Sequence, residues 1–149
     1  MSKMAGVECA LWSVANYGPR CPRCLDPVTG HSRDNHCRLC LGTGFSPPYR
    51  GPVDMWCLFS EDSQHVLKEA SGGDGMSEQK NFSVRMAGAV PTKKNDVLHD
   101  RRSGKRYYVN QVQVAAELRR VPLVQTLLVS EIATTDPAYA VGEAQWPLN

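Results

Sequence analysis

Four cysteines arranged as two closely spaced pairs are the residues of this chain best suited to chemistry. They are Cys21, Cys24, Cys37 and Cys40, with two residues inside each pair and twelve between the pairs. Two intervening residues let both thiolates of a pair face one ion, and two such pairs complete a tetrahedron. The spacing therefore predicts a four-cysteine site that holds a structural Zn²⁺ ion.

The sequence leaves some alternatives to this site open. Cys9 and Cys57 bring the cysteines to six, an even number that also suits disulfides. We interpret these two instead as small buried residues. His31 and His36 lie between the pairs and are competing ligands, and another metal is a further alternative. Four thiolates leave no position for water or substrate, which indicates a structural rather than a catalytic site.

Composition and charge place few limits on function. The chain has 149 residues, of which 42% are hydrophobic and 21% charged, and its net charge is +2. This length suits one domain with an appended module, and so small a charge does not indicate a nucleic-acid or membrane partner. No apolar run reaches the roughly 18 residues of a membrane helix, and no signal stretch is visible. We therefore expect a cytosolic setting, where paired cysteines favour metal.

Changes in residue composition and apolar periodicity divide the chain into four segments. We expect an N-terminal arm over residues 1–16, a zinc ribbon over 17–52, a β-barrel domain over 53–135 and an extended tail over 136–149. The second segment is rich in Cys, Pro, Gly and Arg and shows little apolar periodicity. A segment so short and so poor in apolar residues needs a metal ion or disulfides for stability.

Strand-like patterns dominate the third segment. Apolar runs and period-two alternation predict strands over 53–59, 81–86, 97–100, 105–112 and 121–132. Gly104 indicates a hairpin turn, residues 60–80 are expected to form a flexible loop, and 115–120 suits a helical turn or a strand link equally. The spacing predicts a mainly β fold, a small antiparallel barrel or sandwich with an N-terminal zinc-ribbon module.

Six basic residues crowd one stretch of the barrel domain: Lys93, Lys94, Arg101, Arg102, Lys105 and Arg106. They are candidate contacts to a DNA channel or to neighbouring subunits in a ring. Asp96 and Asp100 interrupt them, and we favour a solvated hairpin as the explanation of this pattern. No Ser-His-Asp grouping, phosphate loop or dinucleotide fingerprint is present in the sequence, so we expect no enzymatic activity.

Several motifs resemble known families. The cysteine pairs that continue into Gly42-Thr43-Gly44-Phe45 resemble the zinc knuckles of J-protein chaperones. The order of the longer motifs is similar to that of the neck proteins of tailed bacteriophages, the head–tail connector or head-completion (stopper) proteins. Those motifs are Tyr49 with Pro52, Trp56 in a strand, and the segments 95–100, 104–109, 121–125, 127–132 and 136–139.

The phage resemblance implies a mechanical function in the virion neck, after synthesis in the host cytoplasm. Copies would form a ring between portal and tail that continues or closes the DNA channel and docks the tail. The implied partners are further copies, a portal or adaptor protein, tail terminator or tail tube proteins, and genomic DNA without sequence specificity, with no membrane. The alternative function is a zinc-ribbon module that binds nucleic acid or acts like a chaperone.

Overall fold

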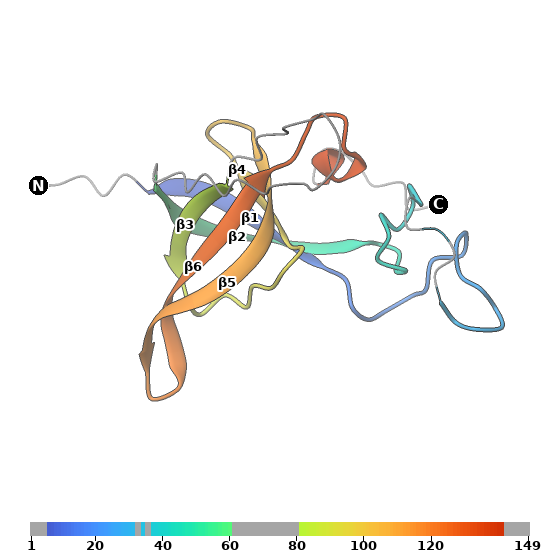
Figure 1. Ribbon diagram of the computed structural model, residues 1–149, viewed down its shortest axis with the longest axis horizontal. Helices are drawn as coiled ribbons and strands as arrows, with labels where there is room; N and C mark the ends of the chain where they lie inside the picture. Colours follow the sequence, from blue (N-terminus) through green and yellow to red (C-terminus); the bar gives the residue numbers. More distant parts are fainter. Residues whose placement is uncertain (1–5, 32–33, 35–36, 61–80, 142–149) are drawn as a thin grey trace, which may run out of the picture.

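Six antiparallel strands form a closed barrel in the computed structural model, which describes residues 6–31, 34, 37–60 and 81–141 (Figure 1). The strands are β1 (Val7–Val14), β2 (Tyr49–Ser60), β3 (Asn81–Ala87), β4 (Val97–Asp100), β5 (Arg106–Leu118) and β6 (Val121–Glu131). Their order around the barrel is β1-β2-β3-β6-β5-β4, and β4 pairs with β1 to close it. The predicted mainly β fold is confirmed, and it is a barrel rather than a sandwich.

The barrel already begins with β1, inside the segment that we expected to be an N-terminal arm. β1 pairs with both β2 and β4, so the barrel does not close without it. Cys9 and Leu11 point into the core and are fully buried, as alternate residues of a strand do. The cysteine segment is therefore an insertion between β1 and β2, not a module that precedes the barrel.

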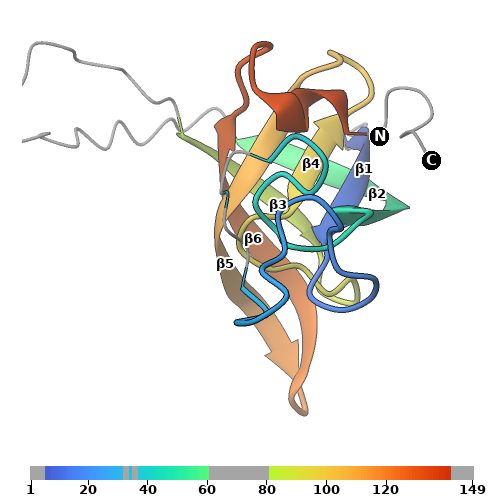
Figure 2. The same cartoon turned by 90° about the vertical axis from the view of Figure 1, so that its right-hand side faces the viewer.

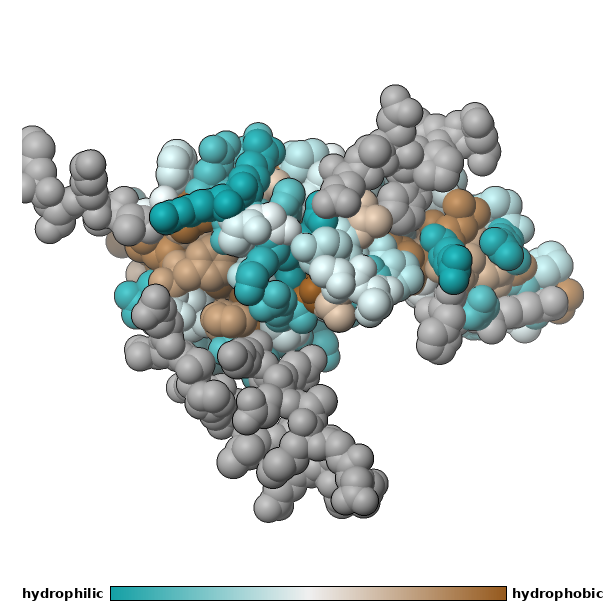
Figure 3. Space-filling view, turned by 90° about the horizontal axis from the view of Figure 1, so that it is seen from above, coloured by the Kyte–Doolittle hydropathy of each residue, from teal (hydrophilic) through white to brown (hydrophobic). Residues whose placement is uncertain are grey.

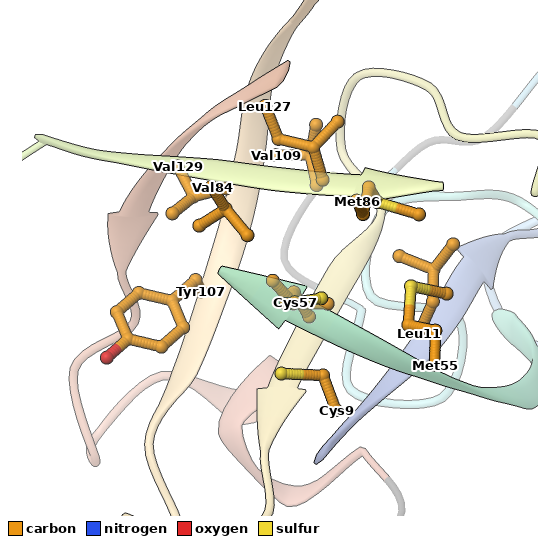
Figure 4. Packing of buried hydrophobic residues seen from close by; sticks show 11 residues of the cluster. Cys9, Leu11, Met55, Cys57, Val84, Met86, Tyr107, Val109, Leu127 and Val129 are labelled. Carbon is orange, nitrogen blue, oxygen red and sulfur yellow. The ribbon is translucent and has the colours of Figure 1, made fainter. Parts of the chain in front are cut away.

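Alternate residues of the strands fill the barrel interior. The core consists of Cys9, Leu11, Met55, Cys57, Val84, Met86, Leu98, Tyr107, Val109, Leu127 and Val129 (Figure 4). The Tyr107 ring lies 5.6 Å from both the Phe59 and the Phe82 ring centroids. Cys9 and Cys57 are free, buried thiols, as we interpreted them. The neighbouring Cys57 sulfur and burial raise the pKa of Cys9, which keeps this thiol neutral.

The segment 115–120, which suited a helical turn or a strand link, belongs to a long hairpin. β5 runs to Leu118, and β6 begins at Val121 directly opposite it. Arg119 and Arg120 form the turn with φ angles of 49° and 66°. Positive φ at both central residues is typical of the type I′ turn. The twist of this turn matches that of the two strands that a two-residue loop connects. The end of this hairpin projects beyond the barrel (Figure 1).

The first residues of the expected extended tail form a 3-10 helix, Pro137–Ala140. Asp136 accepts a hydrogen bond from the Ala138 N–H at 2.9 Å, and both Ala138 and Val141 are buried. Residues 142–149 of the tail and 61–80 of the expected loop lie outside the described residues. Among those described, no helix has the length and apolarity needed to cross a membrane.

Gly51 lies where β2 passes β1 through a register shift between Leu11 and Ser13. Its φ is 130°, and a Cβ there would lie 2.9 Å from the Leu11 carbonyl oxygen. Gly104 has a φ of 74° but open space around its Cβ position. We expect Gly51→Ala to lower the free energy of unfolding by more than Gly104→Ala. A positive φ costs a residue with a Cβ about 1–2 kcal/mol at either position, and only at Gly51 does a clash with the Leu11 carbonyl add to that strain. Urea unfolding measures both; equal losses would contradict this close approach.

Candidate metal centre

The insertion between β1 and β2 carries the four cysteines away from the barrel (Figure 1; Figure 2 views the molecule from this side). At its base, the Ala15 N–H donates to the Pro48 carbonyl at 2.8 Å. Further out, Arg20 and Phe45 form an isolated β-bridge, and the Arg20 guanidinium lies 4.8 Å from the Phe45 ring centroid. These contacts hold the two arms of the insertion together, so the two cysteine pairs meet.

The four sulfur atoms form one compact cluster. All lie within 4.8 Å of one another, with 3.3 Å between Cys24 and Cys40 and 3.9 Å between Cys21 and Cys37. Each cysteine is at most 5% exposed, and Leu39 packs against the cluster. The structure thus brings together the four residues that the spacing selected, in an arrangement that can hold a metal ion.

A Gly-Thr-Gly sequence shapes the turn that follows the second pair. Gly42 and Gly44 each have a φ of 79°, a conformation that side chains with a Cβ rarely adopt. Between them, the Thr43 hydroxyl donates to the Cys40 carbonyl at 2.7 Å. The Cys21 N–H donates to the Gly44 carbonyl at 2.9 Å, which ties the first pair to the turn of the second. This short motif therefore positions both pairs.

The two thiols of the second pair ionise with different ease. Burial opposes ionisation of Cys37, but the backbone N–H groups of Cys40 and Leu39 outweigh it and lower the Cys37 pKa to about 7. Burial and the Cys24 sulfur raise the pKa of Cys40 to about 12, against the N–H groups of the following glycines. A bound cation favours the thiolate at every sulfur, so metal binding and proton release are linked here.

The competing ligands receive no support from the described residues. His31 is exposed and does not belong to the sulfur cluster, and His36 lies outside the described residues. The four cysteines are free, and their closest sulfurs are farther apart than the roughly 2.05 Å of a disulfide bond. The arrangement therefore favours four sulfur ligands on one ion.

Arg106, one of the six basic candidates, is not on the surface. Its side chain is fully buried, and its guanidinium lies 4.9 Å from the Tyr139 ring centroid. The 3-10 helix that carries Tyr139 covers this position, and the sequence around Arg106 does not reveal that cover. Arg106 therefore cannot contact DNA or a neighbouring subunit in this conformation.

The other basic candidates are exposed, but two of them face carboxylates. Arg101 pairs with Asp54 and also lies 3.6 Å from Glu8. Lys105 lies 3.2 Å from Glu131. The remaining exposed candidates are Lys93, Lys94 and Arg102. The six residues thus do not form one continuous basic surface.

Two exposed apolar surfaces on the barrel strands were not among the predicted sites. The hairpin patch, on the projecting part of β5 and β6, consists of Val114, Leu118, Val121, Leu123 and Val124. The β2 patch consists of Val53, Trp56 and Leu58. Seen from above, apolar surface gathers at the barrel end of the molecule and on the insertion at the other end (Figure 3), whereas the projecting hairpin points away from this view (Figure 1). The signal available in the sequence was alternation that continues beyond the length of an ordinary strand.

Comparison with protein-family models and with curated proteins gives no match. Among solved structures, the chain is similar to that of the phage-like element PBSX protein xkdH from Bacillus subtilis, with 16% sequence identity and a TM-score of 0.44. The similarity covers 87% of this chain and 96% of that chain. At this level, the likeness carries no assignment of function.

Replacing Cys37 by Ser tests the metal centre. We expect native mass spectrometry to show that the variant loses its bound metal, because three thiolates cannot close the tetrahedron. The barrel should keep its strand signal in circular dichroism, because the cysteine cluster and the barrel core share no side chain. The control Cys57→Ser should retain metal but melt at a lower temperature. Loss of the barrel on chelation of the unmodified protein would contradict this division.

Proposed function

We propose that this chain is a structural, non-catalytic component of a tailed-phage neck. Copies form a ring between portal and tail that continues or closes the DNA channel and docks the tail. The observation that carries the proposal is the hairpin patch, whose five residues are 36–60% exposed. Exposed apolar side chains gathered on one projecting hairpin are typical of a site of protein–protein contact. Of the motifs that resemble neck proteins, the segment 121–125 begins on this same hairpin.

Folding of the barrel does not explain the hairpin patch. Gln125 is buried where the core ends, and its side-chain amide donates to the Ala87 and Val90 carbonyls at 3.1 and 2.7 Å. It also donates to the Thr92 hydroxyl at 3.2 Å. This polar group terminates the apolar interior, so the side chains beyond it do not contribute to the core. These apolar side chains are therefore exposed for contact with another protein surface.

We propose Zn²⁺ as the ion that the sulfur cluster holds. A tetrahedral site with Zn–S bonds of about 2.3 Å places its sulfurs about 3.8 Å apart. The Cys24–Cys40 and Cys21–Cys37 sulfur pairs, at 3.3 and 3.9 Å, lie on either side of this value. Four thiolates complete the coordination, which supports a structural role. In the ring, the insertion would be a rigid clip toward a neighbouring subunit or ring.

The proposed partners follow from the ring. They are further copies of the chain, a portal or adaptor protein on one side, and tail terminator or tail tube proteins on the other. Genomic DNA passes through the lumen and is contacted without sequence specificity. Lys93 and Lys94 are exposed and suit such phosphate contacts, whereas Arg106 does not.

Immunogold labelling of particles tests the location. In particles of the phage that encodes this chain, we expect label at the junction of head and tail, because the ring lies between portal and tail. Particles assembled without the chain serve as the control and should show none. Label spread over the head shell, label at the distal end of the tail, or no label would contradict the proposal.

The salt dependence of DNA binding separates the neck function from the nucleic-acid-binding alternative. We expect weak, sequence-independent binding to duplex DNA, with a logarithmic salt slope of at most about 3, as for contact with three phosphates. Replacing Lys93 and Lys94 by Ala should lower that slope in fluorescence anisotropy. The matched pair Arg23→Ala and Arg38→Ala, exposed residues of the insertion, should leave it unchanged. Tight binding that depends on Arg23 and Arg38 would favour the alternative.

A further inference from the structure

We propose that Arg50 is a latch that fixes the direction in which the cysteine insertion leaves the barrel. Arg50 lies near the start of β2, opposite Ser13 of β1, and its side chain reaches the first arm of the insertion. The latch makes the insertion a rigid arm rather than a hinged one. It acts within one copy of the chain, so it does not depend on the proposed neck function.

The two arms of the insertion have unequal lengths close to the barrel. The Ala15 N–H donates to the Pro48 carbonyl at 2.8 Å, and further out the Ser46 N–H donates to the Pro19 carbonyl at 3.1 Å. Between these hydrogen bonds the first arm has three residues, 16–18, and the second arm has only residue 47. All three residues of the first arm are exposed. Regular pairing is not possible across so unequal a stretch, which makes it the place where the insertion would bend.

Arg50 spans this unequal stretch through two contacts with Tyr17. Its Nη2 donates to the Tyr17 carbonyl at 2.6 Å, and its guanidinium carbon lies 3.8 Å from the centroid of the Tyr17 ring. A guanidinium donates hydrogen bonds in its plane and stacks on aromatic rings with its face. One side chain from the barrel therefore holds both the backbone and the ring of Tyr17, a residue that is 64% exposed.

Gly18 leaves room for the guanidinium. Its φ is 114°, and a Cβ at this position would clash with Nη2 of Arg50. Glycine adopts such a conformation without the steric cost that a Cβ brings. Gly30, between the two cysteine pairs, also has a positive φ of 69°, but nothing lies within 4 Å of its Cβ position. The close approach at Gly18 therefore belongs to the latch and is not common to the glycines of the insertion.

A buried carboxylate anchors the barrel side of the latch. Asp96 is fully buried, and its two oxygens accept hydrogen bonds from the Val14 and Lys93 N–H groups, each at 2.9 Å. Val14 is the last residue of β1 and pairs with Tyr49, the neighbour of Arg50 in β2. Asp96 thus ties the end of β1 to the loop before β4. Arg50 therefore projects from a base that is itself held in place.

The arms pair again on the far side of the unequal stretch. Arg20 and Phe45 form the isolated β-bridge, and the Cys21 N–H donates to the Gly44 carbonyl at 2.9 Å. These contacts continue from Pro19 to the first cysteine of the cluster. A fixed position of Tyr17 is therefore transmitted to the sulfur cluster, because paired backbone lies between them.

The distance between two spin labels in the full chain tests the latch. The labels are attached to p-acetylphenylalanine, which replaces Arg38 on the insertion and Arg85 on β3, two exposed residues, so that the cysteines stay unmodified. Dilution into unlabelled protein restricts double electron–electron resonance to distances within one copy. We expect one narrow peak with Arg50 present. Arg50→Ala removes both contacts, and Gly18→Ala displaces the guanidinium, so each should replace the peak by a broad distribution.

Two matched variants are the controls. Gly30→Ala places a Cβ at a positive φ away from Arg50, and Arg23→Ala removes another exposed arginine, so both should keep the narrow peak. Native mass spectrometry should find the same bound metal in every variant, because Arg50 is not part of the cysteine cluster.

Three results would overturn the latch. They are a broad distribution with Arg50 present, a narrow peak that survives Arg50→Ala, and loss of metal from Arg50→Ala, which would make Arg50 a part of the metal centre. Should Arg50→Ala fail to fold, Gly18→Ala decides, because it leaves every barrel residue in place. A narrow peak in Gly18→Ala then overturns the latch, and a broad one supports it.

Discussion

The pairing of β1 with β4 closes the barrel, and the position of the four-cysteine cluster follows from it. β1 and β2 are neighbours in the sheet, yet residues 15–48 separate them in the chain. A barrel interior filled by side chains has no room for that segment, which therefore projects outward. Outside the barrel it needs a core of its own, and four buried cysteines form that core.

Unequal strand lengths produce the projecting hairpin in a similar way. β4 has 4 residues, and it pairs with β5 only near the start of that strand's 13 residues. The remaining length of β5 can pair only with β6, so the two strands continue together after the barrel has ended. The core ends at Gln125, and the apolar residues beyond it belong to the outside of the molecule.

Local patterns in the sequence were sufficient to predict the fold class, the strand at 81–86 and the grouping of the four cysteines. β1 was not predicted, because its apolar residues 9–12 form a continuous run without strand alternation, and both partner strands lie far along the chain. Residues 115–120 are mostly good helix formers, and pairing with β6 overrides that preference. The burial of Arg106 depends on Tyr139, more than thirty residues away, which local reasoning cannot reach. The four-cysteine cluster could be predicted because its members lie close together in sequence.

One hydrogen bond, from Ala15 to Pro48, joins the two ends of the insertion where it leaves the barrel. The ends of the loop are therefore already adjacent in the folded chain, whatever lies between them. Doubling the length of such a loop costs only about 0.6 kcal/mol of closure entropy. This connection is consequently a position where evolution can graft, exchange or delete an entire module while the six strands keep their register.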